Sequence, residues 1–152
     1  MKKLLLILLC LPMIGLGQGW EQTYGGTDSD AGQSVQQTTD GGYIITGSTE
    51  PFGNGSSGVY LIKTDVLGDS LWTKTFGGEG QGRGNSVQQT SDGGYIIGGV
   101  TFDFGSGSAD VYLIKTDVNG DSLWTKTFGG TTWGDLGNSV QQTTDGGYII
   151  CG

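Results

Sequence analysis

The chain has 152 residues and a formal net charge of −8, and 32 of its residues are glycine. An acidic chain without a basic patch is poorly suited to bind the phosphate backbone of a nucleic acid. The sequence contains no histidine, which excludes imidazole as a catalytic base or metal ligand and, with it, the Ser-His-Asp and Cys-His schemes.

Residues 1–17 are predicted to form a secretory signal peptide. Lys2 and Lys3 give it a positive start, and the apolar run Leu4–Leu11 is too short to span a bilayer. The small residues of GLG at positions 15–17 precede the expected cleavage site, so Gln18 would begin the exported chain. Two alternatives are a buried strand or helix and a lipoprotein anchored through Cys10, although a leucine stands where a lipoprotein signal has a small residue.

Export would change both the charge and the use of cysteine. Removal of residues 1–17 takes away two lysines and no acidic residue, so the net charge would change from −8 to −10. The exported chain would have no transmembrane anchor, and we expect it at the cell surface, outside the cell or in the periplasm. Cys151 would then have no intramolecular disulfide partner. We expect Cys151 to be a small, half-buried strand residue rather than a reactive thiol.

The rest of the chain repeats itself. The segment VYLIKTDVLGDSLWTKTFGG at Val59–Gly78 returns with one substitution at Val111–Gly130, a shift of 52 residues. A second motif, SVQQTTDGGYII, starts at Ser34 and recurs, with at most one substitution, at Ser86 and Ser139. Such a period is typical of architectures in which each unit packs against its neighbours. A residue present in every copy is therefore expected to serve the fold.

Four strands are predicted in each copy, because runs rich in Val, Ile, Thr, Tyr and Trp alternate with Gly and Asp clusters. In the first copy these runs are Gly32–Thr38, Tyr43–Thr49, Val59–Asp65 and Ser70–Phe76. The Asp- and Gly-containing segments 39–42 and 66–69 predict tight hairpins of a primed or bulged type.

The strands are apolar on both faces. Val59 and Leu61 face one way, while Tyr60 and Ile62 face the other. A sheet with two apolar faces must lie between two other sheets, and four antiparallel strands per 52 residues describe a β-propeller blade. The expected fold is therefore all-β. The alternative is an open β-solenoid, whose coils usually repeat at shorter intervals.

The predicted organisation is a signal peptide followed by a partial propeller at residues 18–152. Its parts are an opening strand at 20–26, a first repeat at 32–78, a second at 84–130 and a partial third at 137–152. Because a propeller needs about four or more blades to close, we expect an incomplete ring and an N-terminal fragment of a longer protein. Exposed apolar faces and strand edges predict that the isolated chain self-associates.

The hairpin VYLIKTDVNGDSLWTKTFGG resembles the blade motif of quinoprotein-type propellers. Together with SVQQTTDGGYII, it resembles the repeat of large exported proteins of Gram-negative bacteria, many of which end in a type IX secretion sorting domain. The resemblance covers nearly all of residues 20–152 and implies that Trp20, Trp72 and Trp124 dock between adjacent blades. It implies a surface or secreted propeller, and the 152 residues include no such sorting domain.

One turn resembles the start of a calcium loop. Asp117, Asn119 and Asp121 provide oxygen ligands at positions one, three and five. The loop would continue with Gly and reach a Glu at position twelve, where this chain has Ser122 and Phe128. The earlier copy also has a leucine in place of the asparagine, so a structural turn is preferred over calcium. No other cofactor is expected.

Two other repeated polar groups have both a structural and a functional interpretation. Asp40, Asp92 and Asp145 precede Gly-Gly and suit turns, whereas a catalytic pair would require two carboxylates to converge. The glutamine pairs are expected to satisfy strand edges and water, or alternatively to line a channel that binds a sugar or peptide. These pairs are Gln36-Gln37, Gln88-Gln89 and Gln141-Gln142.

The segments that differ most between copies are the best candidates for specific binding, because loops on a repeated scaffold carry specificity. They are residues 50–58, 102–110, 79–83 and 131–136. Their aromatic residues are candidates for contact with a carbohydrate or protein partner, with packing onto their own blade as the alternative. These residues are Phe52, Phe102, Phe104 and Trp133.

These features predict an exported, non-enzymatic module that binds a glycan or a protein or has a structural role. The alternative is the propeller part of an enzyme, either quinone-dependent or active on polysaccharide, whose catalytic residues lie outside this chain. GEGQGRG at 78–84 superficially matches a dinucleotide fingerprint, but no helix is predicted after it, so no phosphate loop is expected.

Overall fold

A computed structural model describes residues 19–50, 56–78 and 80–152. The predicted signal peptide and Phe52 lie outside the described residues. Every regular element in the described part of the chain is a β-strand, which confirms the all-β class. Within that part, no helix is long and apolar enough to cross a membrane.

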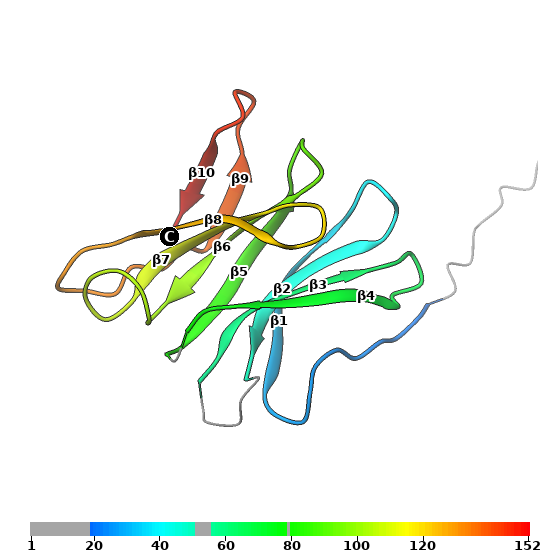
Figure 1. Cartoon of the computed structure of the whole chain (residues 1–152), viewed down its shortest axis with the longest axis horizontal. Helices are drawn as coiled ribbons and strands as arrows, with labels where there is room; N and C mark the ends of the chain where they lie inside the picture. Colours follow the sequence, from blue (N-terminus) through cyan, green and yellow to red (C-terminus); the bar gives the residue numbers. More distant parts are fainter. Residues whose placement is uncertain (1–18, 51–55, 79) are drawn as a thin grey trace, which may run out of the picture.

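The described residues form two four-stranded antiparallel sheets and one hairpin, which do not close into a ring (Figure 1). The first sheet contains β1 (Asp30–Gln37), β2 (Tyr43–Thr49), β3 (Gly58–Thr64) and β4 (Ser70–Phe76) in that order. The second sheet contains β5 (Gly82–Gln89), β6 (Tyr95–Thr101), β7 (Asp110–Thr116) and β8 (Ser122–Phe128). The terminal hairpin contains β9 (Ser139–Gln142) and β10 (Tyr148–Cys151). The four predicted strands of the first copy are thus confirmed to within two residues at each end.

The Asp-Gly-Gly turns explain why both glycines are present. Gly41 has a φ of 86°, and its N–H donates to the carbonyl of Thr38 at 2.9 Å. No non-glycine residue in the described chain has positive φ, which favours the bulged hairpin over a primed turn with Asp in the left-handed region. Gly42 is needed for another reason, because a Cβ there would lie 2.1 Å from the carbonyl oxygen of Thr64.

The sheets stack face to face, and the core lies between them. Ile44 and Leu61 of the first sheet pack with Val87, Ile97 and Ile114 of the second. The opposite face of the second sheet forms another cluster with the terminal hairpin. Its buried members are Ile96, Leu113 and Val140.

Neighbouring residues of β6 show that this sheet is covered on both sides. Ile96 and Ile97 point to opposite faces, and both side chains are 0% exposed. The expectation that strands with two apolar faces lie between two other sheets is therefore confirmed for the second sheet.

The opening strand predicted at 20–26 is not formed, since these residues have no strand pairing. In the two four-stranded sheets, the strand with this motif, β4 or β8, pairs with the strand that precedes it, β3 or β7. No strand is described before Trp20. The leading segment, residues 20–26, nevertheless contacts the first sheet. Trp20 meets Tyr43 edge-on at 5.6 Å, and the Tyr24 hydroxyl donates to the carbonyl of Gly68 at 2.7 Å.

We expect Ile97→Ala to lower the free energy of unfolding by about 2–5 kcal/mol, because it leaves a cavity between the two sheets. Leu123→Ala, on an exposed position of β8, should change it by less than about 0.5 kcal/mol. Urea unfolding followed by tryptophan fluorescence measures both. Equal effects of the two substitutions would contradict the placement of the core.

Candidate functional site

The repeated Ser and Gln side chains join the first strands of successive sheets, which are β1, β5 and β9. The hydroxyl of Ser34 accepts a hydrogen bond from the N–H of Val87 at 3.4 Å, and Gln36 Oε1 accepts one from Gln89 N at 2.6 Å. The next interface repeats both contacts, from Val140 N to Ser86 Oγ at 3.2 Å and from Gln142 N to Gln88 Oε1 at 2.6 Å. These side chains therefore accept hydrogen bonds from the backbone N–H groups of the edge strands β5 and β9.

The second glutamines of the later two pairs reach in the opposite direction, to the hairpin turn of the preceding sheet, whereas Gln37 Nε2 donates to the carbonyl of Gly41 in its own turn at 3.1 Å. Gln89 Oε1 accepts from Thr39 N at 2.9 Å, and Gln142 Oε1 accepts from Ser91 N at 2.8 Å. Four of the six predicted glutamines thus hold sheets together, which supports their structural interpretation. The three hairpin turns that they help to align lie in a row (Figure 1).

Two of the three repeated tryptophans lie between successive sheets, and Trp20 lies on the outer face of the first sheet. Trp72 of β4 meets Tyr95 edge-on at 5.9 Å, and Trp124 of β8 meets Tyr148 of β10 at 5.7 Å. Trp72 also covers Gly120, where a Cβ would be only 2.7 Å from the indole ring. Burial raises the pKa of Tyr95 to about 12, so its phenol stays neutral.

The calcium candidate is occupied by protein hydrogen-bond donors. Asp117 Oδ1 accepts from Asn119 N and Asp121 N, each at 2.9 Å, as in an aspartate-capped turn. Asp121 Oδ1 pairs with Lys74 Nζ of the first sheet at 2.6 Å. No group of three or more carboxylate, Cys or His ligands occurs among the residues that the structure describes. Both aspartates therefore have structural partners.

The aspartates of the Asp-Gly-Gly turns are each engaged with their own sheet. Asp92 accepts from the Thr90 hydroxyl at 2.5 Å and from Gly94 N at 3.0 Å, and it pairs with Lys115 Nζ at 2.9 Å. The Lys115 side chain is almost fully buried. These partners, the threonine first and the lysine second, lower the pKa of Asp92 to about 2.

The other two copies of this turn differ in one partner. Asp40 pairs with the buried Lys63 at 2.9 Å, and its pKa is likewise lowered to about 2. Asp145 keeps the Thr143 and Gly147 contacts, which lower its pKa, but it has no lysine partner among the described residues. Each aspartate thus stabilises its own turn, and the contacts do not bring two of them together as a catalytic pair.

The described parts of the variable segments gather at the end of the sheets opposite the Asp-Gly-Gly turns (Figure 1). A groove of about 370 Å³ lies among them. Arg83, the only arginine in the chain, lines it together with Ser48 and Gln81. Phe102 and Leu136 add apolar surface. The groove therefore combines a cation, a hydroxyl, an amide and an exposed aromatic ring.

The predicted loop aromatics have different surroundings. Phe102 is exposed and lines the groove. Phe104 instead packs against Tyr112 of its own sheet at 5.8 Å, which agrees with the structural alternative. Trp133 is exposed in the segment between the second sheet and the hairpin and does not line the groove.

Apart from Phe102, none of the residues that line the groove is among the sequence-based candidate residues. Arg83 and Leu136 fall in the segments 79–83 and 131–136, whose variation between copies was the only signal for them. Cys151 also differs from expectation, because it is exposed rather than half-buried. It lies on β10, where no further sheet covers the side of the hairpin that faces away from the second sheet.

The chain matches no protein-family model, and no curated protein is significantly similar to it.

Low pH should destabilise the protein through Asp40 and Asp92. Their folded pKa is about 2 and their ordinary value is 3.8, so the stabilisation is present above about pH 4 and is lost as the pH falls toward 2. Asp92→Asn should lower the free energy of unfolding at pH 7, because it removes the charged partner of Lys115. The loss should be only about 1 kcal/mol, since the carboxylate is largely exposed and water screens its charge. Urea unfolding from pH 7 to pH 2 measures both effects.

The matched control is Asp145→Asn, which removes the same turn residue where no lysine contact is present. It should cost less than Asp92→Asn at pH 7. An unchanged pH dependence in Asp92→Asn would show that the Lys115 pair does not contribute.

Calcium should leave the melting temperature unchanged at millimolar concentration, because backbone N–H groups and the Lys74 ammonium already occupy the Asp117 and Asp121 carboxylates. Differential scanning fluorimetry with magnesium as the control measures this. A calcium-specific rise that is lost in Asp117→Asn would establish the calcium site.

Proposed function

We propose that the chain is part of an exported, non-enzymatic β-propeller that binds a carboxylate-bearing glycan at its variable-loop end. The single observation that carries this proposal is the groove lined by Arg83 and Phe102 at that end. The repeated contacts between the sheets give the groove a rigid frame, and its lining comes from segments that differ between the copies.

The chemistry of the lining favours an acidic sugar. A guanidinium group matches a carboxylate through two parallel N–H donors. Ser48 and Gln81 can exchange hydrogen bonds with ring hydroxyls, while Phe102 and Leu136 offer apolar contact to the face of a sugar ring. In a chain with a net charge of −8, one arginine in a groove is also a local site for an anion.

Two other features support the propeller and the export in this proposal. Antiparallel four-stranded sheets of 52-residue period stack face to face, and the sequence resembles the blades of exported propellers. The features of residues 1–17 are those of a signal peptide. An enzymatic role has no comparable support, because the repeated carboxylates and glutamines are engaged in holding the fold.

A glycan array that includes uronate-containing oligosaccharides tests the proposal. We expect binding to acidic members, and at least a tenfold loss of affinity in Arg83→Ala and in Phe102→Ala. Leu67→Ala, exposed in the β3–β4 turn at the other end of the sheets, is the control and should bind as wild type. Binding that is absent throughout, or equal in all three variants, would contradict the assignment.

A further inference from the structure

The outward face of the first sheet is open, although the same face is buried in the later copies. Val35 of β1 is 62% exposed, whereas its equivalents Val87 and Val140 are 6% and 3% exposed. The two buried valines are covered by the preceding sheet. The difference therefore comes from the missing neighbour rather than from the residue.

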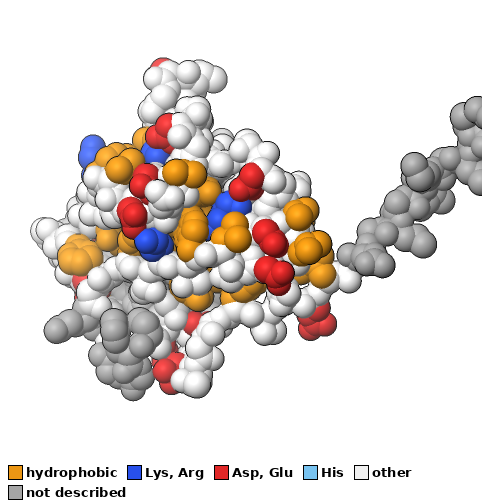
Figure 2. Space-filling view, turned by 45° about the vertical axis from the view of Figure 1, so that its right-hand side comes forward, with side chains coloured by type: hydrophobic (Ala, Val, Ile, Leu, Met, Phe, Trp, Pro, Cys, Tyr) orange, Lys and Arg blue, Asp and Glu red, His pale blue; other side chains and the backbone are white. Residues whose placement is uncertain are grey.

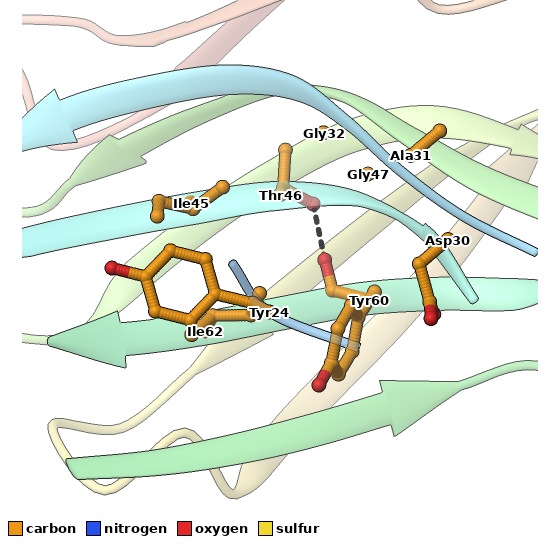
Figure 3. A pocket seen from close by; sticks show the side chains of 9 residues that line it. All are labelled: Tyr24, Asp30, Ala31, Gly32, Ile45, Thr46, Gly47, Tyr60 and Ile62. Atoms are coloured by element: carbon orange, nitrogen blue, oxygen red, sulfur yellow. Dashed lines mark hydrogen bonds between the residues drawn. The ribbon is translucent and has the colours of Figure 1, made fainter. Parts of the chain in front are cut away.

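This open face contains an apolar groove of about 390 Å³ between the leading segment and β1. Trp20 and Tyr24 form one side, and Val35 and Ile45 form the other. Figure 3 shows Tyr24 beside Ile45 and Ile62 in the adjoining pocket. Figure 2, turned toward this side of the molecule, shows hydrophobic side chains at the surface among acidic ones.

The terminal hairpin carries the complementary face. Ile149 is 60% exposed, whereas its equivalents Ile44 and Ile96 are fully buried against the next sheet or hairpin. Cys151 is exposed on the same face of β10, two residues further along. Its equivalent Thr46 is buried.

We propose that the terminal hairpin of a second copy of this chain docks on the open face of the first sheet, so that the two copies associate head to tail. The contact continues an interface that the molecule already forms twice, between its two sheets and between the second sheet and the hairpin. In it, Ile149 of one copy fills the groove beside Val35 of the other. Cys151 covers Gly32 as Thr46 covers Gly84.

The width of the open face fits a two-stranded occupant. The leading segment covers the first sheet in the way that β4 covers the second. Trp20 meets Tyr43 as Trp72 meets Tyr95. Gln22 donates to Asp69 at 3.2 Å, at the place where Lys74 pairs with Asp121 in the next interface. The leading segment leaves β1 and the adjoining part of β2 uncovered. On the second sheet, the equivalent surface of β5 is covered by β1 and β2. The hairpin strands β9 and β10 are the equivalents of β1 and β2.

The polar groups of the two faces also match. By the contacts of the existing interfaces, Ser139 Oγ and Gln141 Oε1 of one copy accept hydrogen bonds from the N–H groups of Val35 and Gln37 of the other. Gln37 Oε1 then accepts from Thr144 N in the reverse direction. Each copy presents one face of each kind, so association generates rings or open chains.

A mixing experiment tests the direction of docking. Val35→Asp and Ile149→Asp each place a charge in the interface but on an exposed side chain of the single chain, so folding should be retained, as circular dichroism checks. In sedimentation velocity, each variant alone should associate at least tenfold more weakly than wild type. An equimolar mixture should recover dimers, because one intact pair of faces remains.

The control is Leu123→Asp, whose side chain is equally exposed on β8 but lies at a position that neither internal interface buries. It should associate as wild type does. Association through residues 1–18 is common to all variants, so only differences between them count. Wild-type association in both interface variants, or no gain on mixing, would overturn the proposal, as would a wild-type chain that is monomeric throughout.

A disulfide provides a second test that does not depend on affinity. A Cβ at Gly84 would lie 3.2 Å from the Cβ of Thr46, close to the separation of about 3.5–4.5 Å in disulfides. In a Cys10→Ser background, Gly32→Cys should therefore cross-link to Cys151 of another copy and give a ladder of oligomers on a non-reducing gel. Ser122→Cys, an exposed control, should cross-link at least tenfold less. Equal cross-linking of the two would overturn the proposed register.

Discussion

The structure depends on burying strands that are apolar on both faces. Ile96 and Ile97 are adjacent on β6, and both are fully buried, one against each neighbouring layer. A single sheet of this sequence would expose one of the two rows to water and lose the hydrophobic stabilisation of that row. Stacking is therefore a condition for the stability of each sheet, and the repeated motifs are the means of achieving it.

Apolar contact alone does not determine how far one sheet slides over the next, and the polar repeats supply that register. Ser34 and Gln36 bind two backbone N–H groups of β5, on the side of that strand that has no neighbour in its own sheet. This both fixes the position of β5 and covers an edge that would otherwise be open to pairing with another chain. Trp72 fixes the position of the β7–β8 turn, because its ring requires the space that Gly120 leaves. The repeated glutamines, which resemble a binding motif in the sequence, thus hold successive sheets in register.

The sequence predicts local structure well because its signals are local. Period-two runs and Asp-Gly turns locate β1–β4 to within two residues, and the apolar character of both strand faces predicts stacking. What it does not predict is the partner of each segment. Residues 20–26 have the composition of a strand but no adjacent strand, and Cys151 has the position of a buried residue but no covering layer. Arg83 was missed because its site is formed only when loops distant in sequence meet.

A repeat array allows burial to be compared at constant sequence. Gly32 and Gly84 occupy the same place in successive copies, yet Thr46 covers only Gly84. The exposure of Val35 is likewise a consequence of its place in the array, because the same residue type at positions 87 and 140 is buried. Hence the two ends of the array differ from its middle in what they can bind, even where their residues are identical. Variation between the copies is instead concentrated in the loops around Arg83, whereas the contacts between the sheets come from residues that repeat.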